Sequence, residues 1–342
     1  MLEPLPPQST PTSPQLHSNE GGNDNRRSTV IWKGLTEVET ATWVDNTYRE
    51  IVGWSTNNLF EPPKCAATTN VVKEMTAVVN NYNRDNPLAP FALETLFLLP
   101  KLFFQKTHSN MKSNENVKAV TRRVDLWLNN KLDELMDEAR AIQKRLPRPS
   151  SNKQGREDKA RSFADRMRQG KVSPALRVLN EDESGGVLPI TRDTIRQLQE
   201  KHPPPSELEG LRLQGCHRPP NRIIYEMITG EMVWKKSLQT HGSAGPSGLD
   251  AKGWRHLLSG TLCGNAANDL CSTLTALRKK LATTTCHHVD AFTACRLIPL
   301  DKKPGCRPIG IGEVLRRIVG KCIMAVKKDI MMAAGNLQVC AG

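Results

Sequence analysis

Clusters of proline divide this 342-residue chain, because proline lacks a backbone N–H donor and interrupts helices and central strands. Residues 202–222 carry five prolines, and residues 147–159 (PRPSSNKQGREDK) combine proline and serine with basic residues. Both stretches are typical of linkers. Residues 1–29, rich in proline, serine, asparagine and glutamine, are predicted to be disordered because they cannot bury a core.

The linkers leave three segments to fold. Residues 30–146 are predicted to form a helical region, with one long amphipathic helix from about Asn116 to Arg145. Trp32, Trp43 and Trp54 recur every eleven residues there, and ordinary core packing explains them better than a binding stripe. Residues 160–201 are predicted to be a helical segment broken near Gly170 and Pro174, with a short strand from Gly186 to Ile190 before a helix that starts at Thr191. Residues 223–342 carry the most regular patterns.

Composition narrows the class of partner. The formal net charge is +13, and basic chains collect polyanions through the release of counterions from phosphate backbones. Nucleic acid is therefore the first partner to test, although a solvated basic surface explains the charge equally well.

Cysteine usage indicates a reducing compartment. The nine cysteines form no CxxC pair, which argues against a disulfide framework. The N-terminal sequence lacks a secretory signal, and the most apolar stretch, Phe91 to Phe104, is too short to span a bilayer. We expect an intracellular protein of the cytoplasm or nucleus, not secreted and without a membrane partner.

Residues 241–258 (HGSAGPSGLDAKGWRHLL) form the first informative segment. Three glycines and Pro246 predict a tight irregular loop, and Asp250 is placed to cap the helix that follows. Trp254, Leu257 and Leu258 then fall on one buried face. The spacing does not match a phosphate-binding P-loop.

Residues 294–312 (ACRLIPLDKKPGCRPIGIG) predict a projecting β-hairpin. Lys303-Pro304-Gly305-Cys306 suits a type II turn, in which glycine at the third position accepts a positive φ, and Pro308 suggests an edge strand. The candidate nucleotide-binding residues near its tip are Lys302, Lys303 and Arg307. Three cations on a stiff hairpin can grip a triphosphate. The alternative is a charged tip that only faces water.

Residues 313–332 predict an amphipathic helix with one apolar and one basic face. Arg316, Arg317 and Lys321 on the basic face are candidate nucleic-acid-binding residues, and a solvated face is the alternative. The predicted fold is mostly α with a small β-hairpin. Cys286-His287-His288 lies near Cys263 and Cys271 in the sequence, but the spacing fits no common zinc module, so helix-packed cysteines and no metal site are expected.

The order GPSGLDAKGW, RLIPLDKKPGCRPIGIGEVLRRIVGK and AAGNLQVCAG resembles reverse transcriptases of non-LTR (LINE-like) retrotransposons over residues 223–342. Segments such as FLLPKLFFQK resemble the region that precedes the polymerase in the same proteins. The resemblance implies the fingers of a right-hand polymerase of α+β class, an RNA-directed DNA polymerase and hence a nucleotidyltransferase. It implies that Arg307, and Lys302 or Lys303, contact a deoxynucleotide triphosphate and an RNA or DNA template.

The family's palm holds aspartates that bind two metal ions, one motif being an aromatic-x-Asp-Asp turn. No such turn occurs in the sequence, so no catalytic residue is assigned, and Mg²⁺ is expected only where a palm is present. We expect truncated fingers without polymerase activity alone. The alternatives are a non-catalytic nucleic-acid-binding protein, and an unstable remnant that exposes the apolar residues from Ile318 to Val326.

Overall fold

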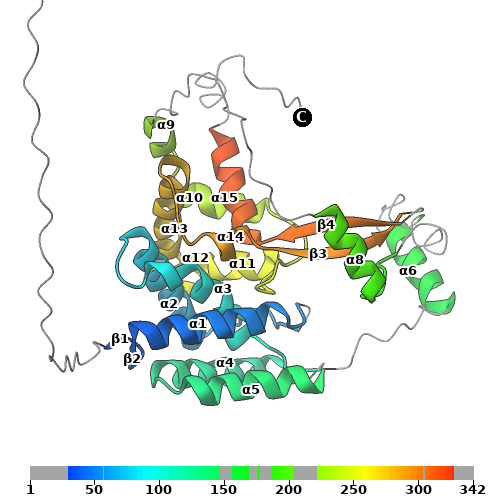
Figure 1. The fold of residues 1–342 in the computed structure, drawn as a ribbon, viewed down its shortest axis with the longest axis horizontal. Coiled ribbons are helices and arrows are strands. Elements are labelled where there is room, and N and C mark those ends of the chain that lie inside the picture. Colours follow the sequence, from blue (N-terminus) through cyan, green and yellow to red (C-terminus); the bar gives the residue numbers. More distant parts are fainter. Residues whose placement is uncertain are drawn as a thin grey trace, which may run out of the picture.

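The computed structural model describes residues 30–56, 58–108, 110–146, 156–168, 176, 186–202, 222–302 and 305–326. This part of the chain is mostly helical and contains two small antiparallel sheets of two strands each, as the predicted fold class requires. Most of the helices gather into one body, the hairpin of β3 (Cys295–Asp301) and β4 (Cys306–Gly312) extends from it, and α8 (Arg192–Lys201) lies against this hairpin (Figure 1). None of the described helices has the length and apolarity needed to cross a membrane.

The N-terminal region begins with a small hairpin that sequence analysis did not predict. Its elements are β1 (Val30–Trp32), β2 (Leu35–Thr36), α1 (Glu37–Val52), α2 (Ala66–Asn83), α3 (Ala89–Phe103), α4 (Ser113–Leu128) and α5 (Leu132–Arg145). Thr36 and Glu39 form a capping box that starts α1, because each side chain bonds the other residue's backbone N–H. The indole rings of Trp32 and Trp43 pack together with centroids 5.6 Å apart, as core packing predicts.

Helix α3 is the central helix of this region. It is apolar around most of its circumference and most of its residues are buried, and such a helix is stable only when neighbours surround it. Helices α1, α2, α4, α5 and α14 (Asp290–Thr293) all contact it. The buried Arg123 of α4 closes the C-terminal end of α3 by donating to the carbonyls of Phe103 and Gln105 at 2.9 and 2.8 Å.

The single helix predicted from Asn116 to Arg145 is wrong. Helix α4 ends at Leu128 and α5 begins at Leu132. Asn130 takes a left-handed conformation with φ of 58°, which asparagine tolerates better than most residues. The apolar pattern continues across this break because both helices bury an apolar face. Periodicity alone therefore does not reveal where one helix ends and the next begins.

The C-terminal region packs onto the same core. Its elements are α9 (Arg222–Glu226), α10 (Gly230–Leu238), α11 (Ala251–Leu257), α12 (Gly260–Cys263), α13 (Asn265–Thr283), α14, β3 (Cys295–Asp301), β4 (Cys306–Gly312) and α15 (Val314–Ala325). Helix α13 lies along α2, and one cluster of buried apolar residues runs from Val44 to Val326. The two predicted regions therefore share one hydrophobic core.

The apolar face of α15 is covered. Leu315, Ile318 and Cys322 are fully buried, and Val326 is 4% exposed, because α10, α11 and α14 contact this helix. Met324 is 56% exposed, but the expectation that the residues from Ile318 to Val326 together form an exposed apolar surface is wrong. Cys263 and Cys271 are likewise buried in α12 and α13, as expected of packed cysteines.

Between the two regions the structure describes α6 (Arg156–Arg168) and α8 (Arg192–Lys201). Helix α6 begins inside the segment predicted to be a linker. Helix α8 starts where predicted, with the Thr191 hydroxyl accepting from the Thr194 N–H. The predicted disorder of residues 1–29, the breaks at Gly170 and Pro174, and most of the Pro-rich linker 202–222 lie outside the described residues.

The turn at Asn130 generates a prediction for stability. We expect Asn130→Ala to lower the free energy of unfolding by about 1 kcal/mol, because a Cβ-bearing residue without a polar side chain is strained in the left-handed region. Asn130→Gly, which relieves that strain, should be close to neutral. Urea unfolding followed by circular dichroism measures both. Equal losses for the two variants would contradict the assigned role of the backbone conformation.

Candidate nucleotide and nucleic-acid interface

The β3–β4 hairpin places two candidate residues on one face. In its register Leu300 pairs with Arg307 and Ile298 with Ile309, and the hydrogen bond from Lys302 N to Gly305 O, 3.0 Å long, continues the ladder. Alternate residues of a strand share a face, so Lys302 and Arg307 are diagonal neighbours on the same side. Both are exposed, and neither side chain contacts a hydrogen-bond or ionic partner among the described residues.

The turn of the hairpin contains the glycine that the sequence predicted for it. Gly305 has φ of 93°, the positive value predicted for it. The closing hydrogen bond puts the reversal between Lys302 and Gly305, one position earlier than the predicted turn, and Cys306 already pairs with Asp301 in β4. Lys303, the third candidate of the tip, lies outside the described residues.

The three candidate residues of α15 all donate to backbone carbonyls. Arg316 Nη1 reaches Thr293 O at 3.2 Å, and Lys321 Nζ bonds Gln239 O. Arg316 and Lys321 remain exposed, whereas Arg317 is half-buried and bonds His241 O at 2.9 Å and Ser243 O. Arg317 therefore holds the loop that precedes α11, a structural role that the basic pattern of the sequence did not indicate.

This loop, residues 242–250, is fixed to the start of α15. The Ser247 N–H and hydroxyl both donate to the Glu313 carboxylate, each at a distance of 2.7 Å. A Cβ on Gly245 would lie 2.8 Å from Glu313 Cα, so only glycine allows this approach. Asp250 caps α11 as predicted, because its Oδ1 accepts from Gly253 N at 2.7 Å.

Two buried charged residues lie on either side of the loop. Lys101 of α3 has no exposed surface and donates to the carbonyls of Ile51 and Trp54 at 2.7 and 3.1 Å, while its Cε lies close to Gly248. Burial lowers the pKa of Lys101 to about 7. Burial raises the pKa of Glu313 to about 7, and the hydrogen bonds from Ser247 partly offset that rise.

Sequence analysis missed both residues. Lys101 was visible only as a polar interruption in the apolar stretch from Phe91 to Phe104, and Glu313 as the residue before an amphipathic helix. A charged residue inside an otherwise apolar helix signals a buried, hydrogen-bonded group, but its partners come from distant segments.

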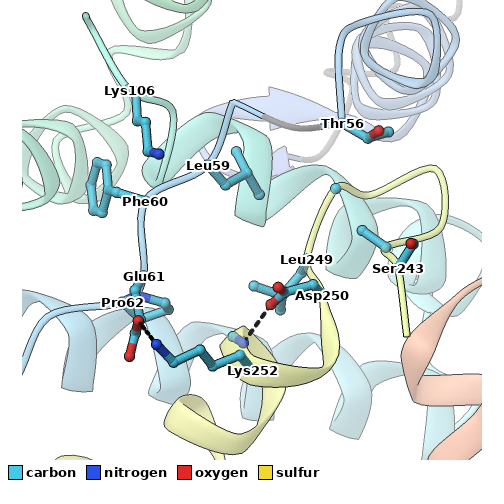
Figure 2. Close-up of a pocket in the computed structure, with 13 residues that line it drawn as sticks. Thr56, Leu59, Phe60, Glu61, Pro62, Lys106, Ser243, Leu249, Asp250 and Lys252 are labelled. Atoms are coloured by element: carbon cyan, nitrogen blue, oxygen red, sulfur yellow. Dashed lines mark hydrogen bonds and ion pairs between the residues drawn. The ribbon is translucent and has the colours of Figure 1, made fainter. Parts of the chain in front are cut away.

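A cleft of about 470 Å³ opens beside this loop (Figure 2). One wall is the extended segment around Leu59, which pairs with Gln105, and the other is the loop from Ser243 to Leu249. Lys252 is paired with Glu61, whereas Lys106 points its ammonium group into the cleft (Figure 2). The cleft connects to the base of the hairpin through Thr56, whose hydroxyl accepts a hydrogen bond from Arg296 of β3.

Among the described residues, no three His, Cys, Asp or Glu side chains are grouped so that they could hold a metal ion.

The chain was compared with models of protein families, with curated proteins and with solved structures, and none of them matches it.

The raised pKa of Glu313 predicts how stability varies with pH. Between its ordinary value of 4.5 and about 7, the folded state holds this proton more firmly than the unfolded chain does. Raising the pH through this window should therefore lower the free energy of unfolding, and the loss should level off above about pH 7. Glu313→Gln keeps a neutral group of the same shape and should abolish this component. Urea unfolding of both proteins from pH 5 to 7.5 tests it, and parallel curves would contradict the prediction.

Proposed function

We propose that this chain carries the fingers of an RNA-directed DNA polymerase from a non-LTR retrotransposon, and that the β3–β4 hairpin holds the incoming deoxynucleotide triphosphate and its template. The observation that carries the proposal is the placement of Lys302 and Arg307. They are exposed, diagonal to one another on one hairpin face, and unpaired among the described residues. Arg317, in contrast, donates to two backbone carbonyls and thereby holds a loop.

The chemistry of the two side chains suits a triphosphate. The guanidinium of Arg307 presents two parallel N–H donors to phosphate oxygens, and the Lys302 ammonium adds a mobile point charge. The hairpin fixes the backbone of both residues, so less conformational entropy is lost when phosphate binds. The order of the loop, hairpin and helix motifs along the sequence supports the family assignment.

Binding, and not the bond-forming step, is the role proposed for these residues. Phosphoryl transfer in this family uses carboxylates that hold two metal ions, and the sequence contains no aromatic-x-Asp-Asp turn. Mg²⁺ would then arrive with the triphosphate and be held by carboxylates of a palm. The described residues bind and orient the substrate in this proposal.

A second candidate function is nucleic-acid binding without chemistry. It is favoured by Arg316 and Lys321 of α15, which stay exposed although each bonds one backbone carbonyl. It is also favoured by Lys106 in the cleft, whose ammonium group has no partner among the described residues, and by the net charge of +13. Such a protein would bind RNA with an affinity that falls steeply with salt, and Arg307 would contribute one phosphate contact among several.

The variant Arg307→Ala separates the two functions. Under the leading proposal, its affinity for a deoxynucleotide triphosphate with Mg²⁺ falls about tenfold or more, because a bidentate charge-assisted contact is lost. Its affinity for single-stranded RNA falls less, and the salt slope decreases by about one. Arg307→Lys should recover only part of the triphosphate affinity. Isothermal titration calorimetry and fluorescence anisotropy measure the two affinities.

Arg84→Ala is the matched control, since Arg84 is exposed at the end of α2 and its removal changes the net charge equally. Both affinities should stay close to the wild-type values. Equal losses of triphosphate affinity in Arg84→Ala and Arg307→Ala would overturn the assignment of the hairpin. Template-dependent primer extension by this chain alone would overturn the binding-only role.

A further inference from the structure

The hairpin that carries Arg307 needs support from outside its own two strands. None of the described core cluster comes from β3 or β4, and an isolated two-stranded hairpin is marginally stable in water. On this same face the base of the hairpin is held by Arg296 of β3, which donates to the Thr56 hydroxyl, but the face around Lys302 and Arg307 near the tip must stay open if it is to bind phosphate. Support near the tip can therefore come only from the strand edges and from the opposite face.

The outer edge of β3 is covered by residues 186–188. Val187 forms an antiparallel bridge with Leu300, the Leu188 N–H donates to Pro299 O at 2.9 Å, and the Asp301 N–H donates to Gly186 O at 2.9 Å. This short segment lies antiparallel beside β3 and forms an isolated bridge with it, not a full strand. Sequence analysis predicted a strand from Gly186 to Ile190, of which the structure forms only the bridge at Val187.

Helix α8 follows directly and packs against β4 (Figure 1). Cys306 and Pro299, which lie on the face opposite Arg307, are both buried, and Gln197 Oε1 lies against Gly305. Lys201, in the last turn of α8, donates from its ammonium group to Cys306 O. That carbonyl belongs to the peptide bond that joins Cys306 to Arg307.

We infer that residues 186–202 are a brace that positions the hairpin, and that Lys201 is the positioning residue for Arg307. The segment clamps β3 at one edge and β4 at the other, and it leaves the face of Lys302 and Arg307 open. Lys201 does not lie on the binding face and acts through the Cys306–Arg307 peptide. The expected effect of Lys201 on triphosphate affinity rests on the proposed function. Its expected effect on the order of the hairpin does not depend on any ligand.

Lys201→Met removes the ammonium group and keeps most of the aliphatic stem. We expect amide hydrogen exchange in residues 295–312 of the full chain to accelerate about threefold to tenfold, because one charge-assisted hydrogen bond at the hairpin is lost. The amide of Arg307, which shares a peptide unit with the Cys306 carbonyl, is the most direct probe. The midpoint of global unfolding should not move, since the hairpin lies outside the core cluster.

Two variants make the test specific. Lys201→Arg retains a cationic donor and should restore slow exchange in residues 295–312. Arg196→Met removes the same charge from α8, where Arg196 is exposed and pairs with Asp193 and Glu200, and should leave exchange in the hairpin unchanged. Exchange of the hairpin at the wild-type rate in Lys201→Met, or equal acceleration in Arg196→Met, would overturn the brace.

The same variants then report on binding. If the brace positions Arg307, Lys201→Met weakens the affinity for a deoxynucleotide triphosphate with Mg²⁺ about threefold to tenfold, and Lys201→Arg recovers it. Faster exchange with unchanged triphosphate affinity would overturn the positioning role. If the wild-type chain binds no triphosphate while Lys201→Met still loosens the hairpin, the proposed function fails and the structural part of the brace stands.

Discussion

The glycine loop of residues 242–248 lies between two buried charged side chains, and much of the structure depends on how they hold it. Lys101 reaches it from α3, at the centre of the N-terminal helices, and Glu313 reaches it from the start of α15. Each group is costly to bury, and each is stable there because its polar atoms find partners in the loop or at the end of α1. The loop thereby connects the helical body to the strand that enters α15.

This arrangement divides the basic residues of the chain by role. One group donates hydrogen bonds to backbone carbonyls and stabilises helix ends or loops, as Arg123, Lys101 and Arg317 do. The other group includes Arg307 and Lys302 on the projecting hairpin, whose side chains have no hydrogen-bond partner among the described residues. A net charge of +13 says nothing about this division, because it counts both kinds equally. Cations whose side chains have no partner among the described residues, such as Arg307 and Lys302, are available to bind a phosphate.

The features that the sequence predicted correctly are local ones. The Pro304-Gly305 pair between two strand patterns was sufficient to predict the hairpin. Asp250 before an apolar helix was sufficient to predict the cap of that helix. Contacts between distant segments could not be predicted. The pairing of Val187 with Leu300, the packing of α13 on α2 and the burial of Lys101 each join residues far apart in the chain. The break at Asn130 was missed for another reason, since a continuous apolar period conceals a single left-handed residue.

The most direct test of the account is to find where a triphosphate sits. A photoreactive azido-deoxynucleotide triphosphate would be cross-linked to the full chain with Mg²⁺, and the labelled peptides mapped by mass spectrometry. The account predicts label within residues 295–312, suppressed by excess unmodified deoxynucleotide triphosphate. Label confined to the cleft segments 56–62 and 243–253, or label that competitor does not suppress, would contradict the claim that the hairpin is the substrate-binding element.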